Sequence, residues 1–306
     1  MTPLRVVSLL PSATEIVASL GFGDALVGRS HECDFPPGVE RLPVCTAPKL
    51  DPSGSTEEIH QQVEELVSRG LSVYRVDAEL LRDLSPTHVV TQVQCEVCAV
   101  SLADVEQALA RFLAPRPLLI PLNPTSLEDV FEDIARAAAG LGSPQRGKEL
   151  STQLRGRFHE VARKAKSSAV RPRVATVEWL SPLMAAGNWI PELVEMAGGV
   201  NLFGQSGRHS PWLSWEQLRA ADPDRIVLFP CGFSLERLRS EIDLVTRLPG
   251  WNALSAARSR QVFLAEGNQL FNRPGPRLVE TLEALAEMLH PELFLFGLEG
   301  SAWERL

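Results

Sequence analysis

Short runs of aliphatic residues alternate with longer stretches of periodic apolar residues along almost the whole chain. The short runs predict buried strands, and apolar residues that recur every three or four positions predict amphipathic helices. We expect strands at 5–10, 25–29, 71–76, 88–91, 118–122, 174–177, 226–229 and 262–265. We expect helices at 12–21, 56–69, 78–84, 191–197, 214–220, 235–248 and 277–289, and another after Ser101. This alternation indicates an α/β fold with mainly parallel sheets.

Several predicted helices begin at a Ser or Thr that Glu follows three positions later. Residues 12–15, 55–58 and 125–128 have this pattern. In a capping box the two side chains satisfy backbone N–H groups that the first helical turn leaves free. We therefore expect capped helix starts at these three places.

One long helical region divides the strand and helix alternation into two halves. Residues 125–167 are helical in pattern, with a break around 140–144, and the part after the break is charged and weakly amphipathic, as in a helix that bridges two lobes. The expected organisation is an N-terminal α/β lobe at 1–124, connecting helices at 125–170, a C-terminal α/β lobe at 171–290 and a loosely attached tail at 291–306. Ligands bind at the carboxyl ends of parallel strands, so we expect a ligand cleft between the lobes.

The composition limits the partners and the compartment. The 306 residues carry a formal charge of −8, which argues against nucleic acid or an anionic membrane as the main partner. Met1–Arg5 lacks the regions of a secretory signal, and no apolar run spans a bilayer. We expect a cytoplasmic protein without membrane insertion, and the odd number of five cysteines favours reduced thiols.

Three motifs give the chain a family resemblance. The opening RVVSLLPSATEIVASLG at 5–21, the segment LLRDLSP at 80–86 and the segment AADPDRIV at 220–227 resemble the substrate-binding proteins of ABC importers for cobalamin, haem and iron chelates. That resemblance implies two α/β lobes joined by one rigid helix, and the cobalamin-binding branch is the nearest. It also implies that Glu79 and Glu216 dock on a transporter, whereas the residues alone suggest solvated glutamates in a first helical turn.

The chain departs from that family pattern in its first lobe. An extra helix and strand occupy 56–76, and the loop 92–98 carries Cys95 and Cys98 where the periplasmic proteins have an aromatic residue. A Cys-x-x-Cys pair near a helix start gains thiolate character. With His31 and Cys33, and Cys231 from the other lobe, it can hold zinc or an iron–sulfur cluster. The alternative is two small buried residues, because a second cysteine pair is missing.

The other candidates line the predicted cleft loops. Aromatic faces suit a macrocyclic ligand, although core packing is an equal alternative for each ring, and Arg273 can pair with an acidic group of the ligand. The expected ligand contacts are Ser12, His31, Glu32, Gln92, Gln94, Cys95, Glu178, Trp179, Trp189, Phe233, Phe271, Asn272 and Arg273.

These residues lead to three hypotheses about function. The first, which we favour, is a non-enzymatic binding protein for a corrinoid or related metal chelate that serves an ABC-type transporter. The second is a cytoplasmic metal-binding, cluster-binding or thiol-dependent protein that uses Cys95 and Cys98 with His31 and Cys33, although no base is spaced for a thiol enzyme. The third is a cytoplasmic adaptor that has kept Glu79 and Glu216 for docking on a protein partner.

Overall fold

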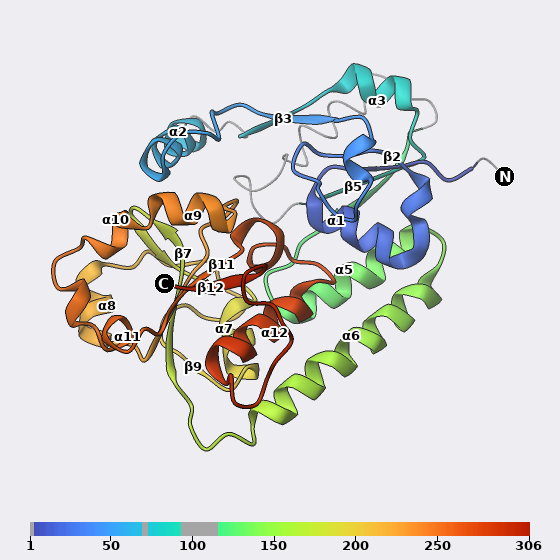
Figure 1. The fold of residues 1–306 in the computed structure, drawn as a ribbon. Coiled ribbons are helices and arrows are strands. Elements are labelled where there is room, and N and C mark those ends of the chain that lie inside the picture. The colour runs from blue at the N-terminus through green and yellow to red at the C-terminus, as the bar shows by residue number, and fades with distance from the viewer. Residues whose placement is uncertain (1–2, 69–72, 93–115) are drawn as a thin grey trace. The chain divides into compact units, whose positions relative to one another are not determined.

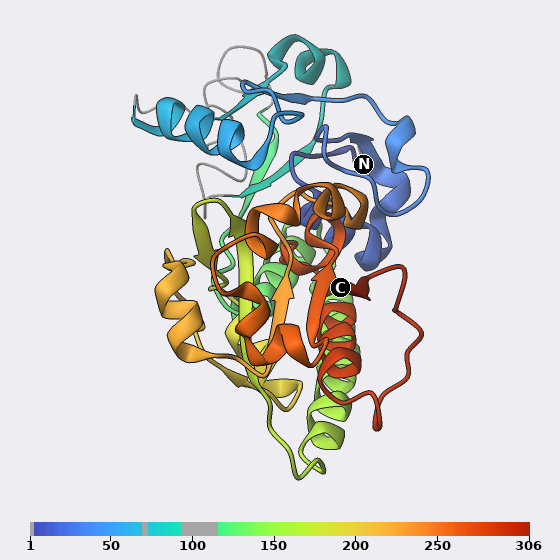
Figure 2. The same cartoon turned by 60° about the vertical axis from the view of Figure 1, so that its left-hand side comes forward.

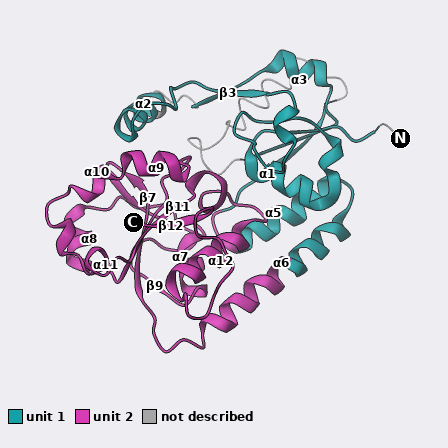
Figure 3. Ribbon diagram, viewed as in Figure 1, with its two compact units in different colours: residues 1–124, 128–153 teal, residues 125–127, 154–306 magenta. Residues whose placement is uncertain are grey.

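The computed structural model describes residues 3–68, 73–92 and 116–306 (Figure 1). Within these ranges the chain divides into two compact units. Unit 1 comprises residues 1–124 and 128–153, and unit 2 comprises residues 125–127 and 154–306 (Figure 3). The helix α6 (Pro144–Ala165) begins in unit 1 and ends in unit 2.

Unit 1 is built on a parallel sheet. Its four strands lie in the order β2 (Leu26–Gly28), β1 (Val6–Ser8), β5 (His88–Gln92) and β6 (Leu118–Leu122). Val7, Leu9, Leu81, Val89 and the thiol of Cys45 form a buried core on it. The other described elements of this unit are α1 (Pro11–Val17), η1 (Ala18–Phe22), η2 (Gly23–Ala25), η3 (Val39–Arg41), β3 (Thr46–Pro48), α2 (Thr56–Ser68), β4 (Tyr74–Val76), α3 (Ala78–Leu84) and α5 (Leu127–Gly140).

Unit 2 contains a larger mixed sheet. Its strands follow the order β12 (Trp303–Arg305), β11 (Val262–Ala265), β10 (Arg225–Leu228), β7 (Arg173–Leu180) and β8 (Leu183–Ala185), and β9 (Val200–Asn201) also pairs with β7. β7, β10 and β11 are parallel, so their carboxyl ends share one edge. Helices lie on both sides of this sheet (Figure 2). They include α7 (Ile190–Met196), α8 (Trp215–Ala221), α9 (Leu235–Glu241), α10 (Asp243–Thr246), η4 (Trp251–Ala253), α11 (Ser255–Arg258), η5 (Gly267–Phe271) and α12 (Leu278–Leu289).

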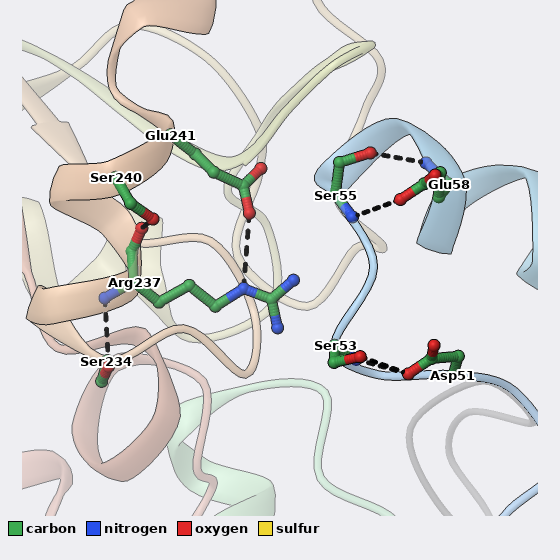
Figure 4. A network of polar contacts seen from close by, with 8 residues as sticks. All are labelled: Asp51, Ser53, Ser55, Glu58, Ser234, Arg237, Ser240 and Glu241. Atoms are coloured by element: carbon green, nitrogen blue, oxygen red, sulfur yellow. Dashed lines mark hydrogen bonds and ion pairs between the residues drawn. The ribbon is translucent and has the colours of Figure 1, made fainter.

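Most predicted elements within the described residues agree with the structure, the helix expected after Ser101 lies outside them, and the predicted cap at 12–15 is wrong. α1 begins with Pro11 at its first helical position and Leu10 as its cap, so Ser12 and Glu15 lie inside the helix with buried side chains. Pro favours this position because its fixed φ suits a helix and its missing N–H costs nothing there. The cap at 55–58 is confirmed: Glu58 Oε2 accepts from the Ser55 N–H at 2.8 Å, and Ser55 Oγ accepts from the Glu58 N–H at 3.3 Å (Figure 4).

Two further differences concern pairing between distant segments. The strand expected at 71–76 is present as β4, but it pairs with β3 in a separate two-stranded antiparallel sheet. Residues 291–306, expected as a loosely attached tail, end in β12, which pairs antiparallel with β11. Glu287 fixes this segment, because its carboxylate accepts hydrogen bonds from the backbone of Gly297 and Leu298 and from the Trp303 ring nitrogen.

Candidate functional site

Arg29 organises the loop that leaves the first sheet after β2. Its guanidinium donates to the carbonyl oxygens of Ser30 and Cys33 at 2.9 and 3.2 Å, and to that of Glu40 at 3.1 Å. One side chain therefore binds both ends of the 30–40 loop. This loop lies at the carboxyl edge of the sheet, where the sequence predicts His31 and Glu32 as ligand contacts.

His31 and Glu32 join in a polar cluster around Tyr74. The His31 Nδ1 lies 2.7 Å from Thr46 Oγ1, and the rings of His31 and Tyr74 are 5.2 Å apart. The Tyr74 hydroxyl donates to Glu32 Oε1 at 3.0 Å. Burial, assisted by the nearby charge of Arg29, lowers the pKa of His31 to about 4. The imidazole is therefore neutral at neutral pH, with one ring nitrogen fixed by Thr46.

The neighbouring residues of this edge are buried. The Cys33 thiol lies 3.0 Å from Thr14 Oγ1, which donates to Ser8 Oγ at 2.8 Å. Ser12 and Gln92 expose only 2% and 6% of their surface. Cys33 is thus held in a polar pocket of α1 and β1. The remaining predicted residues of this edge, Gln94, Cys95 and Cys98, lie outside the described residues.

An aromatic and cationic group occupies the carboxyl edge of the second sheet. The rings of Trp179, at the end of β7, and Phe233, just before α9, meet edge to face at 5.7 Å. The guanidinium of Arg237 lies 3.9 Å from the centroid of the buried Phe233 ring. Arg237 also donates from Nε to Glu241 Oε1 at 3.4 Å, and both residues belong to α9 (Figure 4). This arrangement offers a half-buried indole whose neighbour Phe233 carries the Arg237 guanidinium over its ring.

Glu266 fixes the next loop of the same edge. Its buried carboxylate accepts from the backbone N–H groups of Asn268, Gln269 and Leu235 at 3.0, 3.1 and 3.2 Å. It therefore connects η5 to the start of α9. Gly267 is required there, because an added Cβ would lie 2.1 Å from the Pro230 carbonyl oxygen.

Several predicted contacts in this loop are engaged with the protein itself. Phe271 is fully buried, and its ring centroid lies 4.7 Å from that of Phe229. Its carbonyl oxygen accepts a hydrogen bond from the Trp189 indole N–H at 3.0 Å. Asn272 donates to the Phe229 and Gly267 carbonyl oxygens at 3.0 Å each. Arg273 is 5% exposed, whereas Glu178 is half-buried on β7. Glu178, Trp179 and the unpredicted Arg237 thus remain as the partly exposed candidates of this edge.

The described residues offer little support for the metal hypothesis. Among them, no three His, Cys, Asp or Glu side chains are grouped so that they can hold a metal ion. Cys33, Cys45 and Cys231 are free thiols, the last of them exposed. Burial raises the pKa of the Cys45 thiol to about 12, so Cys45 is a core residue and a poor metal ligand.

The two predicted docking glutamates occupy the same place in matching local structures. Asp77 caps α3 and Ser214 caps α8, so that Glu79 and Glu216 are each the second helical residue. Both helices have seven residues and end on a residue with positive φ, which is followed by Pro and then by a strand of the central sheet. Both glutamates are exposed.

Several residues that shape the two edges are absent from the predicted site. Tyr74 is the single tyrosine of the chain, and that rarity was an available signal. Arg29 follows a predicted strand, but its role depends on bonds to carbonyl groups as distant as that of Glu40. Arg237 and Glu266 resemble ordinary helix and strand-end residues, and no local pattern distinguishes them.

A family model for periplasmic binding proteins matches residues 6–268. The chain belongs to this family. A vitamin B12-binding protein from Photorhabdus laumondii is 24% identical over 289 residues, which are 94% of this chain and 88% of the relative. An uncharacterized ABC transporter substrate-binding lipoprotein from Bacillus subtilis is 21% identical, over 95% of this chain and 82% of its own length. The apo structure of the periplasmic heme-binding protein RhuT from Roseiflexus shares 25% identity and a TM-score of 0.69, covering 94% and 98% of the two chains.

Membership confirms the predicted family, its two-lobed α/β fold and a non-enzymatic role in binding a small-molecule ligand for an ABC importer. The thiol-enzyme hypothesis is therefore discarded. The prediction of a cytoplasmic protein is wrong, because the family acts outside the cytoplasm and one relative is a lipoprotein. The adaptor hypothesis and the cytoplasmic metal hypothesis depended on that compartment and lose their basis. Among the described helices, none has the length and apolar character needed to cross a bilayer.

Proposed function

We propose that this member of the family binds a corrinoid or a related metal chelate, with contacts from the carboxyl edges of its two sheets. The observation that carries the proposal is the aromatic and cationic group at the carboxyl edge of the unit 2 sheet. Unit 1 offers the neutral imidazole of His31, and unit 2 offers the half-buried indole of Trp179 against the Phe233 ring, over which the Arg237 guanidinium lies. Planar macrocycles with acidic or amide side groups suit an aromatic face and a cation.

The similarity to a vitamin B12-binding protein and to a heme-binding protein supports a macrocyclic metal chelate as the ligand. The test is a titration with cyanocobalamin and, separately, with hemin, followed by absorbance and by thermal unfolding. A ligand at about 100 times its dissociation constant stabilises the folded state by about 2.7 kcal/mol. Absence of both a spectral change and a thermal shift with either compound would contradict the proposal.

Trp179→Ala tests the predicted aromatic contact. Losing one aromatic face from the ligand site weakens binding about tenfold, or about 1.4 kcal/mol. Phe296→Ala is the matched control, because it removes an exposed ring at the opposite edge of unit 2 and leaves the ligand site intact. Equal affinities of the two variants for cyanocobalamin or hemin would exclude Trp179 as a contact.

The docking of Glu79 and Glu216 on the importer is part of the same proposal. The two matching cap, helix and proline motifs support it, because they present one carboxylate in the same position of each unit. Such a pair suits a partner with two equivalent basic sites.

A further inference from the structure

The amino ends of the parallel strands of the second sheet, opposite to the candidate ligand edge, lie among positively charged residues. We call this end of the sheet the starting edge. β7 begins at Arg173 and β10 begins beside it at Arg225, which pairs with Val174. α6 ends just before β7, and residues 155–173 contain seven Lys or Arg and one acidic residue, Glu160. The whole chain has the reverse balance, with 30 basic and 38 acidic residues.

The cations of this edge remain directed outwards. Arg163, Lys166 and Arg258 are exposed. Of the cations at 155–173, Arg157 and Arg171 pair with Glu283 and Glu195. Two further carboxylates accept hydrogen bonds at this edge. Asp222 accepts from the backbone N–H and the hydroxyl of Ser255, both at 2.7 Å, and Asp224 accepts from the backbone N–H of Arg173 at 2.7 Å. The local surface is therefore basic in an acidic protein.

Exposed apolar side chains also lie in this region. Val170, in the link after α6, is 66% exposed, and Leu295 and Phe296, in the loop after α12, are 93% and 42% exposed. The loop after α12 lies beside the end of α6 (Figures 1 and 2), since Lys164 Nζ lies 4.9 Å from the centroid of the Phe294 ring, which stacks on the Phe296 ring at a centroid distance of 5.7 Å. Exposed apolar residues of this size, close together, mark an interaction site more often than scattered surface residues do.

The protein fixes the apolar loop in this exposed position. The Glu287 carboxylate accepts from the backbone N–H of Phe296, and from those of Gly297 and Leu298 at 2.6 and 3.1 Å. Leu295 directly precedes these three anchored residues. Its exposure is therefore built into the loop, and the side chain projects from a preorganised surface.

From this combination we propose that the starting edge of unit 2 is a peripheral contact for an anionic lipid surface. Cationic side chains attract anionic head groups, and projecting aliphatic and aromatic side chains enter the boundary between head groups and acyl chains. Arg163, Lys166 and Arg258 supply the charge, and Val170, Leu295 and Phe296 supply the apolar contact.

The test is co-sedimentation of the ligand-free protein with vesicles of phosphatidylcholine and phosphatidylglycerol in equal parts. We expect binding at low ionic strength, loss of binding in added NaCl, and no binding to pure phosphatidylcholine. The double variant Arg163→Gln with Lys166→Gln removes two charges and should weaken binding about 30-fold. Val170→Ser with Leu295→Ser should also weaken binding to the mixed vesicles about tenfold or more.

Arg41→Gln with Lys49→Gln is the matched control, because it neutralises two exposed cations of unit 1. It should leave vesicle binding unchanged. The proposal is overturned if the wild type does not sediment with the mixed vesicles, or if the Arg163 and Lys166 variant binds like this control. It is equally overturned if the apolar variant binds like wild type, because the edge is then a site for a soluble polyanion. Thermal unfolding of every variant shows whether it is folded.

Discussion

The neutral imidazole of His31 shows how a single residue takes its chemistry from several segments of the chain. Thr46 holds one ring nitrogen, Tyr74 lies against the ring, and burial together with Arg29 lowers the pKa to about 4. The sequence predicts His31 as a candidate at a loop. Its protonation state depends on residues that are 15 and 43 positions away in the chain and are brought beside it by β3 and β4.

The lowered pKa makes part of the stability dependent on pH. An unfolded chain protonates His31 near its ordinary pKa of 6.5, whereas the folded protein resists protonation until about pH 4. Because the unfolded state binds more protons between these values, the free energy of unfolding falls as the pH falls from 6.5 to 4. His31→Gln, which retains a hydrogen-bonding group for Thr46, should remove this part of the decrease. Urea denaturation of the wild type and the variant at pH 7 and pH 4.5 measures the decrease in the free energy of unfolding. An equal decrease in both proteins would contradict the lowered pKa of His31.

Arg29 provides a second prediction at this scale. Its guanidinium binds carbonyl oxygens from different parts of the 30–40 loop. A lysine ammonium lacks the planar arrangement of several N–H donors that these hydrogen bonds require. Arg29→Lys should destabilise the protein by about 1–3 kcal/mol and weaken binding of cyanocobalamin or hemin, since the loop carries His31 and Glu32. Arg41→Lys, in the same region and exposed, is the control. Wild-type affinity in Arg29→Lys would show that the loop does not contact the ligand.

At the scale of single elements, the two cap, helix and proline motifs repeat one another. α3 and α8 have caps at corresponding positions, one buried leucine each, Leu81 and Leu218, and a terminal residue with positive φ before Pro. The local sequence encodes all of this, because caps, helix length and the residue before Pro follow from short-range chemistry. Both motifs were therefore visible before the structure.

The repeat predicts a measurable effect on transport. Glu79→Gln with Glu216→Gln should reduce uptake of labelled cyanocobalamin at least tenfold in cells that rely on this binding protein, because two charge-assisted contacts with the importer are lost. The dissociation constant of the isolated protein should not change. Glu160→Gln, an exposed glutamate on α6, is the control. Wild-type uptake by the double variant would remove these glutamates from the docking surface.

At the scale of the whole molecule, α6 is a long continuous helix that contributes to both units. Its two internal glycines differ in their surroundings. A Cβ at Gly156 would meet no atom within 4 Å, whereas a Cβ at Gly147 would lie 2.6 Å from the Ala138 Cβ. The same residue type therefore serves helix packing at one position and leaves the helix weaker at the other.

This difference predicts opposite effects of one substitution in one helix. Gly156→Ala should raise the free energy of unfolding by about 1 kcal/mol, since Ala favours a helix and the site is open. Gly147→Ala should lower it by about 1–3 kcal/mol through overpacking. Urea denaturation of the two variants tests both signs, and a stabilising Gly147→Ala would contradict the close contact with α5.

The sequence by itself determined the family, the two α/β lobes, the long helix and most element boundaries. These features depend on apolar periodicity, caps and turn residues, which act over a few positions. Tertiary structure decided what depends on distant residues: the neutral His31 between Thr46 and Tyr74, Arg237 on the Phe233 ring, and β12 paired with β11. It also decided the distribution of charge. A net charge of −8 gives no indication of a basic edge, because a sum over the chain is independent of where folding places each charge.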